Sequence, residues 1–286
     1  MLYLCATPIG NLGDISSRFI EILNSVDLIA AEDTRHTLKL LNHLGISKPM
    51  TSYHEHNKIE KGEYIISLLK EGKDIALVSD AGTPAISDPG EDLVKLCIEN
   101  GLDVTSIPGP VAAINALILS GLSTKRFTFE GFLSVNRRRK KAHLESLKND
   151  THTLIFYEAP HKLVRTLTDM FEVFGERNIA LVKELTKIHE NVFRTTFTKA
   201  LEFFETTPPK GEFVIIVSGA EEEDTPPEEE WWYGLSVVEH VDEYIKKGMS
   251  SKDAIKEVSR DTKTPKRDVY NEYHKNREND SYEEQK

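Results

Sequence analysis

The sequence predicts an α/β protein with two α/β lobes and a small C-terminal helical tail. Short, almost continuously apolar runs first alternate with amphipathic helical patterns, as in domains with a mainly parallel sheet. This alternation is interrupted at residues 124–126, and a second series of apolar runs follows. An acidic segment with a proline pair then interrupts the pattern. We therefore expect lobes at residues 1–123 and 124–219, an acidic linker at 220–234 and a helical tail at 235–286.

Strands are predicted where short apolar runs are bounded by turn residues. In the first lobe these are Leu2–Ala6, Leu28–Ala31, Ile75–Ser79 and Val104–Ile107, with amphipathic helices such as Ile59–Lys70 and Glu91–Asn100 between them. In the second lobe they are Phe127–Leu133, Thr153–Tyr157, Ile179–Glu184 and Phe213–Ser218. The tail has helical patterns at Val237–Lys246 and Lys252–Arg260, a third helix start at Thr264–Pro265, and an end that we expect to fray from Asn276.

Composition excludes several classes of protein. Of the 286 residues, 39% are hydrophobic and 29% are charged, a balance that supports a buried core and excludes disorder of the whole chain. No apolar stretch is long enough for a transmembrane helix, and the N-terminal residues do not have the pattern of a signal peptide. Cys5 and Cys97 lie in apolar segments, so we expect two buried, reduced thiols in a cytoplasmic protein.

Charge is distributed unevenly along the chain. The formal net charge is −11, but residues 221–286 hold 11 Lys and Arg against 19 Asp and Glu, which leaves only −3 on residues 1–220. The lobes can therefore carry a basic face, because binding depends on local potential. The strongest basic run lies within Asn136–His143 and suits contacts with phosphate groups. Its five consecutive cations are Arg137, Arg138, Arg139, Lys140 and Lys141.

Three loops rich in glycine, proline and small residues each follow a predicted strand. They are T-P-I-G-N-L-G-D (Thr7–Asp14), V-S-D-A-G-T-P-A-I-S-D-P-G (Val78–Gly90) and I-P-G-P-V-A-A-I-N-A-L (Ile107–Leu117). Ligands of open α/β sheets bind beyond the carboxyl ends of the strands, so these loops together predict a pocket for a polar ligand. The glycine spacing in the first loop differs from G-x-G-x-x-G, which argues against a dinucleotide site.

Charged residues follow other predicted strands. A-E-D-T-R-H-T (Ala31–Thr37) brings Glu32, Asp33 and Arg35 to the same sheet edge, as a polar rim for substrate; alternatively, Thr34 caps a helix and Asp33 pairs with Arg35. V-K-E-L-T-K-I-H-E (Val182–Glu190) is either a solvated face or a site that activates a hydroxyl group. No spacing of histidine or cysteine in the sequence predicts a metal site, and this includes the pair His54 and His56.

Taken together and in order, these motifs resemble the ribosomal RNA small subunit methyltransferase I family, within the tetrapyrrole methylase superfamily. Further parts of the match are H-E-H-N, G-F-L, Y-E-A-P-H-K, E-L-T-K-I-H-E and K-G-E-F-V, and the match covers residues 2–218. The string S-D-A-G-T-P-A-I-S-D-P-G is its most specific part. The chain departs from the usual pattern at Val111, where serine is common, at Lys183, where arginine is common, and at Ser134, where proline is common.

The resemblance implies the fold, the cofactor and the reaction. It implies two α/β lobes with S-adenosylmethionine in the cleft between them, in a homodimer that methylates the ribose 2′-hydroxyl of a decoding-region cytidine in 16S rRNA. By position, the cofactor-binding residues would be Pro8, Asp80, Ala81, Gly82, Thr83, Val111, Ala112 and Tyr157. Candidates for catalysis are Glu184, Lys187, Lys183, Glu32 and Asp33, and the substrate-binding candidates are Arg35, His54 and the five cations Arg137 to Lys141.

The sequence is also compatible with two other functions. A methyltransferase of the same fold could act on a tetrapyrrole or another small molecule, although the basic run and the specific string favour RNA. A non-catalytic ribosome-binding factor could keep the loops as a scaffold. We expect a Glu or Lys of residues 183–190 to assist deprotonation of the hydroxyl, with Glu32 or Asp33 as the rival, and no metal to be required.

Overall fold

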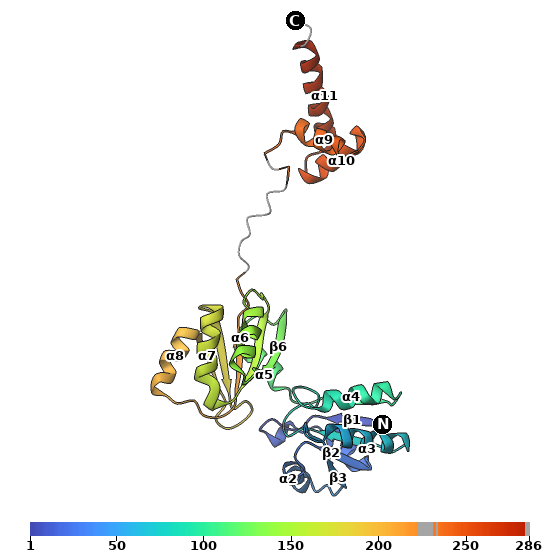
Figure 1. Ribbon diagram of the computed structural model, residues 1–286, viewed down its shortest axis with the longest axis vertical. Coiled ribbons are helices and arrows are strands. Elements are labelled where there is room, and N and C mark those ends of the chain that lie inside the picture. Colours follow the sequence, from blue (N-terminus) through green and yellow to red (C-terminus); the bar gives the residue numbers. More distant parts are fainter. Residues whose placement is uncertain (222–230, 233, 284–286) are drawn as a thin grey trace. The chain divides into compact units, whose positions relative to one another are not determined.

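The computed structural model describes residues 1–221, 231–232 and 234–283, with side chains up to Lys275. The chain divides into two compact units, Met1–Glu221 and Glu222–Lys286. The first unit holds two five-stranded sheets with helices around them (Figure 1). Within the described residues, none of the helices has both the length and the apolar character that spanning a bilayer requires.

The first sheet is entirely parallel, with the strand order β3-β2-β4-β1-β5. Its strands are β1 (Leu2–Cys5), β2 (Leu28–Ala31), β3 (Met50–Ser52), β4 (Ile75–Val78) and β5 (Val104–Ile107). The four strands predicted from apolar runs are confirmed, and their ends agree within one residue. Strand β3 was not predicted, because M-T-S is short and only half-buried at the edge of the sheet.

Helices cover both faces of this sheet. Phe19, Leu23 and Leu41 pack on one face, and Ile65 and Leu93 pack on the other. They belong to α1 (Ser17–Ser25), α2 (Thr34–Leu44), α3 (Lys58–Lys70) and α4 (Gly90–Glu99); a short 3₁₀ helix, η1, spans Leu12–Asp14. With helices on both faces, the central strands β1, β2 and β4 are largely buried, which is why they are apolar at nearly every position, whereas the edge strands β3 and β5 also hold Thr and Ser. Cys5 and Cys97 are buried and free, as predicted.

The second sheet is mixed, with the strand order β6-β7-β10-β8-β9. Strands β6 and β7 are parallel, and the remaining pairs are antiparallel. The strands are β6 (Phe127–Phe132), β7 (Thr153–Glu158), β8 (Asn178–Lys183), β9 (Asn191–Thr196) and β10 (Phe213–Val217). The strand β9 was missed, because N-V-F-R-T-T is a half-exposed edge strand with no continuous apolar run.

Helix α5 (Ala112–Ser120) follows the last strand of the first sheet but packs on the second sheet. Its residues Ala113, Ala116 and Leu117 contact the face formed by residues such as Val182 and Val214. The opposite face is covered by α6 (Arg137–Ser146), α7 (Pro160–Phe174) and α8 (Phe197–Thr206) (Figure 1). The start of α5 is thus held by the core of one lobe while the loop before it belongs to the other.

The second unit contains α9 (Val237–Lys246), α10 (Ser251–Asp261) and α11 (Lys266–Glu283). Its small core includes Val241, Ile255, Val258 and Tyr273. The predicted tail helices are therefore present, and the backbone of α11 continues past Asn276, where a frayed end was expected. Most of the predicted acidic linker, residues 222–230 and 233, lies outside the described residues.

Candidate cofactor and substrate site

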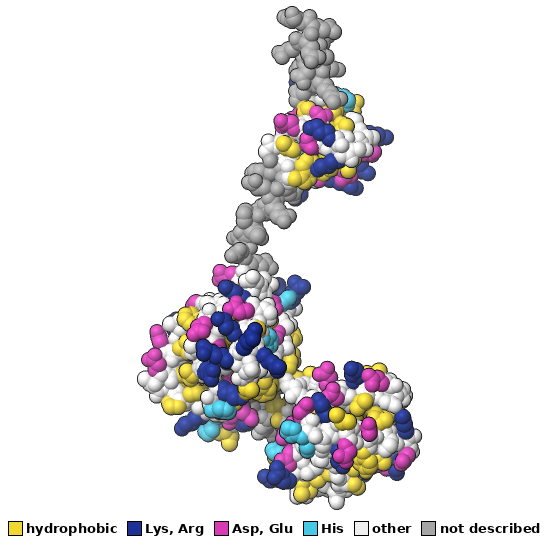
Figure 2. All heavy atoms as spheres, in the orientation of Figure 1, with side chains coloured by type: hydrophobic (Ala, Val, Ile, Leu, Met, Phe, Trp, Pro, Cys, Tyr) yellow, Lys and Arg dark blue, Asp and Glu magenta, His cyan; other side chains and the backbone are white. Residues whose placement is uncertain are grey.

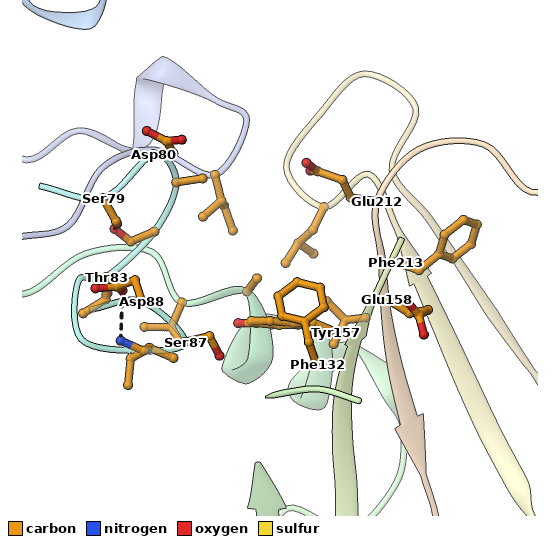
Figure 3. A pocket seen from close by; sticks show the side chains of 18 of the residues that line it. Ser79, Asp80, Thr83, Ser87, Asp88, Phe132, Tyr157, Glu158, Glu212 and Phe213 are labelled. Carbon is orange, nitrogen blue, oxygen red and sulfur yellow. Dashed lines mark hydrogen bonds between the residues drawn. The ribbon is translucent and has the colours of Figure 1, made fainter. Parts of the chain in front are cut away.

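A cavity of about 530 Å³ lies between the two lobes of the first unit. Figure 3 shows Asp80 and Thr83 of the first lobe on one side, with Tyr157 and Glu212 of the second lobe across from them. Seven of the eight predicted cofactor-binding residues line this cavity. They are Asp80, Ala81, Gly82, Thr83, Val111, Ala112 and Tyr157. The eighth, Pro8, lines a cavity that adjoins it.

Hydrogen bonds hold the three glycine-rich loops together at the cavity. The backbones of Thr7 and Gly82 exchange two bonds, with N···O distances of 2.9 and 3.1 Å, and the Thr7 hydroxyl donates to the Ser79 carbonyl at 3.1 Å. The Thr83 hydroxyl donates to the Pro110 carbonyl at 3.0 Å. These bonds bring the loops that follow β1, β4 and β5 to one place, as the sequence predicted.

A single carboxylate organises the loop after β4. Asp88 accepts the backbone N–H groups of Ala85, Ile86 and Gly90 at 3.0, 3.2 and 2.8 Å. Ala85 and Ser87 adopt left-handed φ angles of 69° and 68°, conformations that cost non-glycine residues on the order of 1–3 kcal/mol each. Asp88, Ile86 and Ser87 also line the cavity. Sequence reasoning singled out the loop without assigning these residues a part in the site.

Aromatic side chains form one wall of the cavity. The Tyr157 ring lies edge-on to Phe129 and Phe132, with centroids 5.1 and 5.4 Å apart, and Phe132 is 62% exposed at the cavity. Burial raises the pKa of the Tyr157 phenol. Phe132 was not named as a candidate, although it is the aromatic residue of the G-F-L motif.

Glu32 and Asp33 follow β2 but have different surroundings. Glu32 lines the cavity, and its carboxylate accepts the Asp80 backbone N–H at 3.3 Å; burial raises its pKa. Asp33 accepts the side chain and the backbone N–H of Arg35, both at 2.8 Å, and these bonds hold its pKa well below the ordinary value. The ion-pair interpretation of Asp33 and Arg35 is thus confirmed. The helix cap is Asp33, so the prediction of Thr34 as the cap was wrong: Thr34 is already the first helical residue.

Glu184 and Lys187 form an ion-pair network with Glu212. The Glu184 carboxylate accepts the Glu212 backbone N–H at 2.9 Å and the Lys187 ammonium at 3.1 Å, and this ammonium also contacts the Glu212 carboxylate at 2.8 Å. The Glu212 N–H and the Lys187 ammonium lower the pKa of Glu184. Burial favours neutral Lys187, but its bonds to Glu212 and Glu184 prevail and raise its pKa. The Glu184 carboxylate and the Lys187 ammonium are therefore both charged and engaged in ion pairs or hydrogen bonds. Neither Glu184 nor Lys183 lines either of the two cavities.

The predicted basic run forms the first turns of α6, where the Asn136 side chain caps the helix. Arg137, Arg138, Arg139 and Lys141 are exposed, and Figure 2 shows Lys and Arg side chains gathered on this face of the second lobe. Lys140 differs, because its side chain is only 11% exposed. Its ammonium pairs with Asp169 at 2.8 Å and donates to the Thr166 hydroxyl at 2.7 Å.

The remaining substrate candidates lie on the first lobe. The Arg35 side chain is 88% exposed next to Asp33. His54 lies outside the two cavities, and its buried Nδ1 atom has no hydrogen-bond partner. Among the described residues, no group of three or more His, Cys, Asp or Glu side chains is arranged to hold a metal ion.

The adjoining cavity, of about 510 Å³, shares Ile9, Asp80, Ala81 and Glu212 with the first. Its other lining residues come from the loop after β1, from one side of α2 and from Lys187. They are Thr7, Pro8, Gly10, Leu12, His36, Lys39, Leu40, His43 and Lys187. Sequence reasoning missed His36, Lys39 and His43, although their spacing of three and then four residues places them on one side of a helix.

Comparisons with known proteins agree with this architecture. The sequence model of the family Tetrapyrrole (Corrin/Porphyrin) Methylases matches residues 1–201. Among solved structures, the uroporphyrin-III-C-methyltransferase from Thermus thermophilus superposes with a TM-score of 0.54 at 17% identity, covering 75% of this chain and 93% of that one. A diphthine synthase gives a TM-score of 0.58 at 15% identity, with coverages of 76% and 89%. These structures support the fold.

Sequence relatives are much closer. The protein named ribosomal RNA small subunit methyltransferase I of Halalkalibacterium halodurans is 51% identical over 273 residues, which is 96% of this chain and 94% of the relative. Its namesake in Bacillus subtilis is 49% identical over 274 residues, again 96% and 94%. With its two lobes, its convergent loops and these relatives, the chain belongs to the tetrapyrrole methylase family and, within it, to the ribosomal RNA small subunit methyltransferase I family.

Proposed function

We propose that this protein transfers a methyl group from S-adenosylmethionine to the ribose 2′-hydroxyl of a cytidine in the decoding region of 16S rRNA. The observation that carries the proposal is the convergence of the three strand-end loops on one cavity, in a chain 51% identical to a relative named for small subunit rRNA methylation. The basic turns of α6 suit a polyanionic substrate. We further propose that the enzyme acts as a cytoplasmic homodimer.

The cavity fits the cofactor in size and in chemistry. Its volume of about 530 Å³ is within the usual range for small-molecule sites. Tyr157 and Phe132 offer aromatic surface to a flat base, and the 80–83 and 111–112 backbones offer polar groups. Asp80, Glu32 and Glu212 add carboxylates that attract a cation. When bound, S-adenosylmethionine supplies a methyl group on a positively charged sulfur that leaves readily.

Glu32 is our candidate for the base that takes the proton of the ribose hydroxyl. It is a carboxylate in the cavity with a raised pKa, and its Oε2 atom has one hydrogen bond, from the Asp80 backbone. A positioned base of this kind contributes about 10²–10⁴-fold to a rate. Asp33, Glu184 and Lys187 are engaged in ion pairs. We therefore propose that they stabilise the loops around the site and do not take the proton. The remaining rate acceleration comes from the alignment of the two substrates.

The decisive experiment maps 2′-O-methyl marks on small-subunit RNA from cells with and without the gene, followed by methylation of the unmarked subunit with purified protein. We expect one cytidine mark to disappear and to be restored in vitro. Calorimetry with S-adenosylmethionine separates the alternatives. A protein that binds the cofactor but leaves every rRNA mark unchanged would be a small-molecule methyltransferase, and one that binds no cofactor would be a non-catalytic factor.

A further inference from the structure

The second cavity differs from the first in the charged and polar side chains that line it. His36, Lys39 and His43 line it without lining the first cavity, and Lys187 reaches it from the second lobe. The carboxylates of Asp80 and Glu212 lie where the two cavities meet, since they line both. The nitrogen-bearing side chains of His36, Lys39, His43 and Lys187 therefore line the second cavity, and the acids Asp80 and Glu212 lie where it adjoins the cofactor cavity.

The acids at this border are already engaged. The Asp80 carboxylate accepts the Asp33 backbone N–H at 3.1 Å, and the Glu212 carboxylate contacts the Lys187 ammonium at 2.8 Å. The bond from Asp33, which caps α2, also fixes the start of this helix beside the cofactor cavity. By contrast, Lys39 is exposed and makes no ion pair within the described part of the chain.

We infer that this second cavity binds the sugar-phosphate backbone of the nucleotides that flank the methylated one. The inference rests on the proposed function and deepens it by assigning a site to His36, Lys39 and His43. From His36 to His43 the helix rises about 10 Å, which allows contact with more than one phosphate. Leu12 and Leu40 add apolar surface in the same cavity, against which a sugar or base can pack.

This arrangement of charges explains how an RNA strand is directed toward the cofactor cavity. Phosphates are attracted by the side of α2 that carries Lys39 and are repelled by the carboxylates at the border. A backbone held on α2 therefore stops before the cofactor cavity, and the nucleotide next to it can present its ribose there. The exposed arginines of α6 line neither cavity and add attraction from the second lobe.

The test uses the full chain and unmethylated small ribosomal subunits, and it compares Lys39→Glu with Lys95→Glu. Lys95 is also an exposed lysine without an ion pair in the described structure, and it lies on α4, which covers the opposite face of the first sheet. We expect Lys39→Glu to weaken subunit binding roughly tenfold and to reduce the slope of log affinity against log salt by about one. Lys39→Ala should show a smaller loss in the same direction, and the double variant His36→Ala, His43→Ala should slow single-turnover methylation.

Cofactor affinity, measured by calorimetry, should remain at the wild-type value in each of these variants. The inference is overturned if Lys39→Glu behaves like Lys95→Glu in affinity and in salt dependence. It is also overturned if Lys39→Glu weakens cofactor binding as strongly as subunit binding, because the cavity would then belong to the cofactor site. Failure of the proposed function is a distinct result, in which the wild-type protein does not methylate the subunit at all.

Discussion

The phenolic oxygen of Tyr157 accepts a hydrogen bond from the backbone N–H of Ala113, with an N···O distance of 3.1 Å. Ala113 lies in the first turn of α5, where backbone N–H groups have no partner within the helix. The bond joins β7 to the start of the helix that follows the first lobe. It therefore fixes the tyrosine ring and the Val111–Ala112 backbone relative to each other at the cofactor cavity.

Replacing Tyr157 with phenylalanine keeps the ring but leaves the Ala113 N–H without its acceptor. We expect the free energy of unfolding to fall by about 1 kcal/mol and S-adenosylmethionine affinity to fall several-fold. Denaturant unfolding and calorimetry measure the two effects. Tyr64→Phe, at an exposed position on α3, is the matched control and should change neither. Unchanged cofactor affinity in Tyr157→Phe would show that the bond does not position the site.

Gly10 is predicted to be intolerant of a side chain. Its φ is +151°, and an added Cβ would lie 2.5 Å from Lys187 Cγ and 2.9 Å from Thr186 Oγ1, on the other lobe. We expect Gly10→Ala to reduce the free energy of unfolding by about 1–3 kcal/mol and to slow methylation, because the lobes must shift to make room. In Gly45→Ala, also at positive φ but with no atom within 4 Å, only the backbone strain should remain. Equal losses in the two variants would exclude a role for this interlobe contact.

The pH dependence of methylation should identify the base. If Glu32 must be ionised to take the proton, the single-turnover rate rises with pH and levels off above the pKa of Glu32, which burial places above the ordinary glutamate value. In Glu32→Gln, we expect a rate about 10²–10⁴-fold lower without this acidic limb, and nearly unchanged cofactor affinity. Asp33→Asn should keep the pH profile, because Asp33 is bound to Arg35. A wild-type profile in Glu32→Gln would refute the assignment.

Glu32 also links stability to pH. Its pKa in the folded protein is above that of the unfolded chain, so its favourable contribution is complete at low pH and is lost as the pH rises through the folded-state value. Glu32→Gln removes this dependence. The free energy of unfolding of both proteins should be measured over the same pH range. As the pH rises, we expect Glu32→Gln to become more stable relative to the wild-type protein.

Two neighbouring cations of α6 should respond differently to substitution. Lys140→Met breaks the pair with Asp169 and the bond to Thr166, so we expect it to reduce the free energy of unfolding by about 1–3 kcal/mol. Arg138→Ala removes an exposed side chain and should leave stability unchanged while weakening rRNA binding and its salt dependence. Thermal unfolding and subunit binding at several salt concentrations distinguish the two effects. The opposite pattern would contradict these assignments.

The sequence was most informative where local pattern and tertiary structure agree. The central parallel strands β1, β2 and β4 are covered by helices on both faces and are apolar at nearly every position, and they were predicted within one residue of their ends. The edge strand β5, V-T-S-I, was also predicted, with the same bounds. Strand β3 has only three, half-buried residues, and β9 is half-exposed and has no continuous apolar run, so neither was found. The convergence of three loops was also predictable, because the carboxyl ends of parallel strands meet at one edge of a sheet.

What a side chain does at that edge depended on its partners. From the sequence, Glu32 and Asp33 were equivalent candidates, as were Lys140 and its neighbours. Only the fold places Glu32 in the cavity and turns Lys140 inward to Asp169. The pair of Asp33 with Arg35 is local, and the sequence had already offered it as one alternative. The sequence by itself determined the family, the fold class and the loops of the site, since these follow from local pattern and motif. The tertiary structure decided which charges are paired and which are available, because pairing and desolvation arise from residues far apart in the chain.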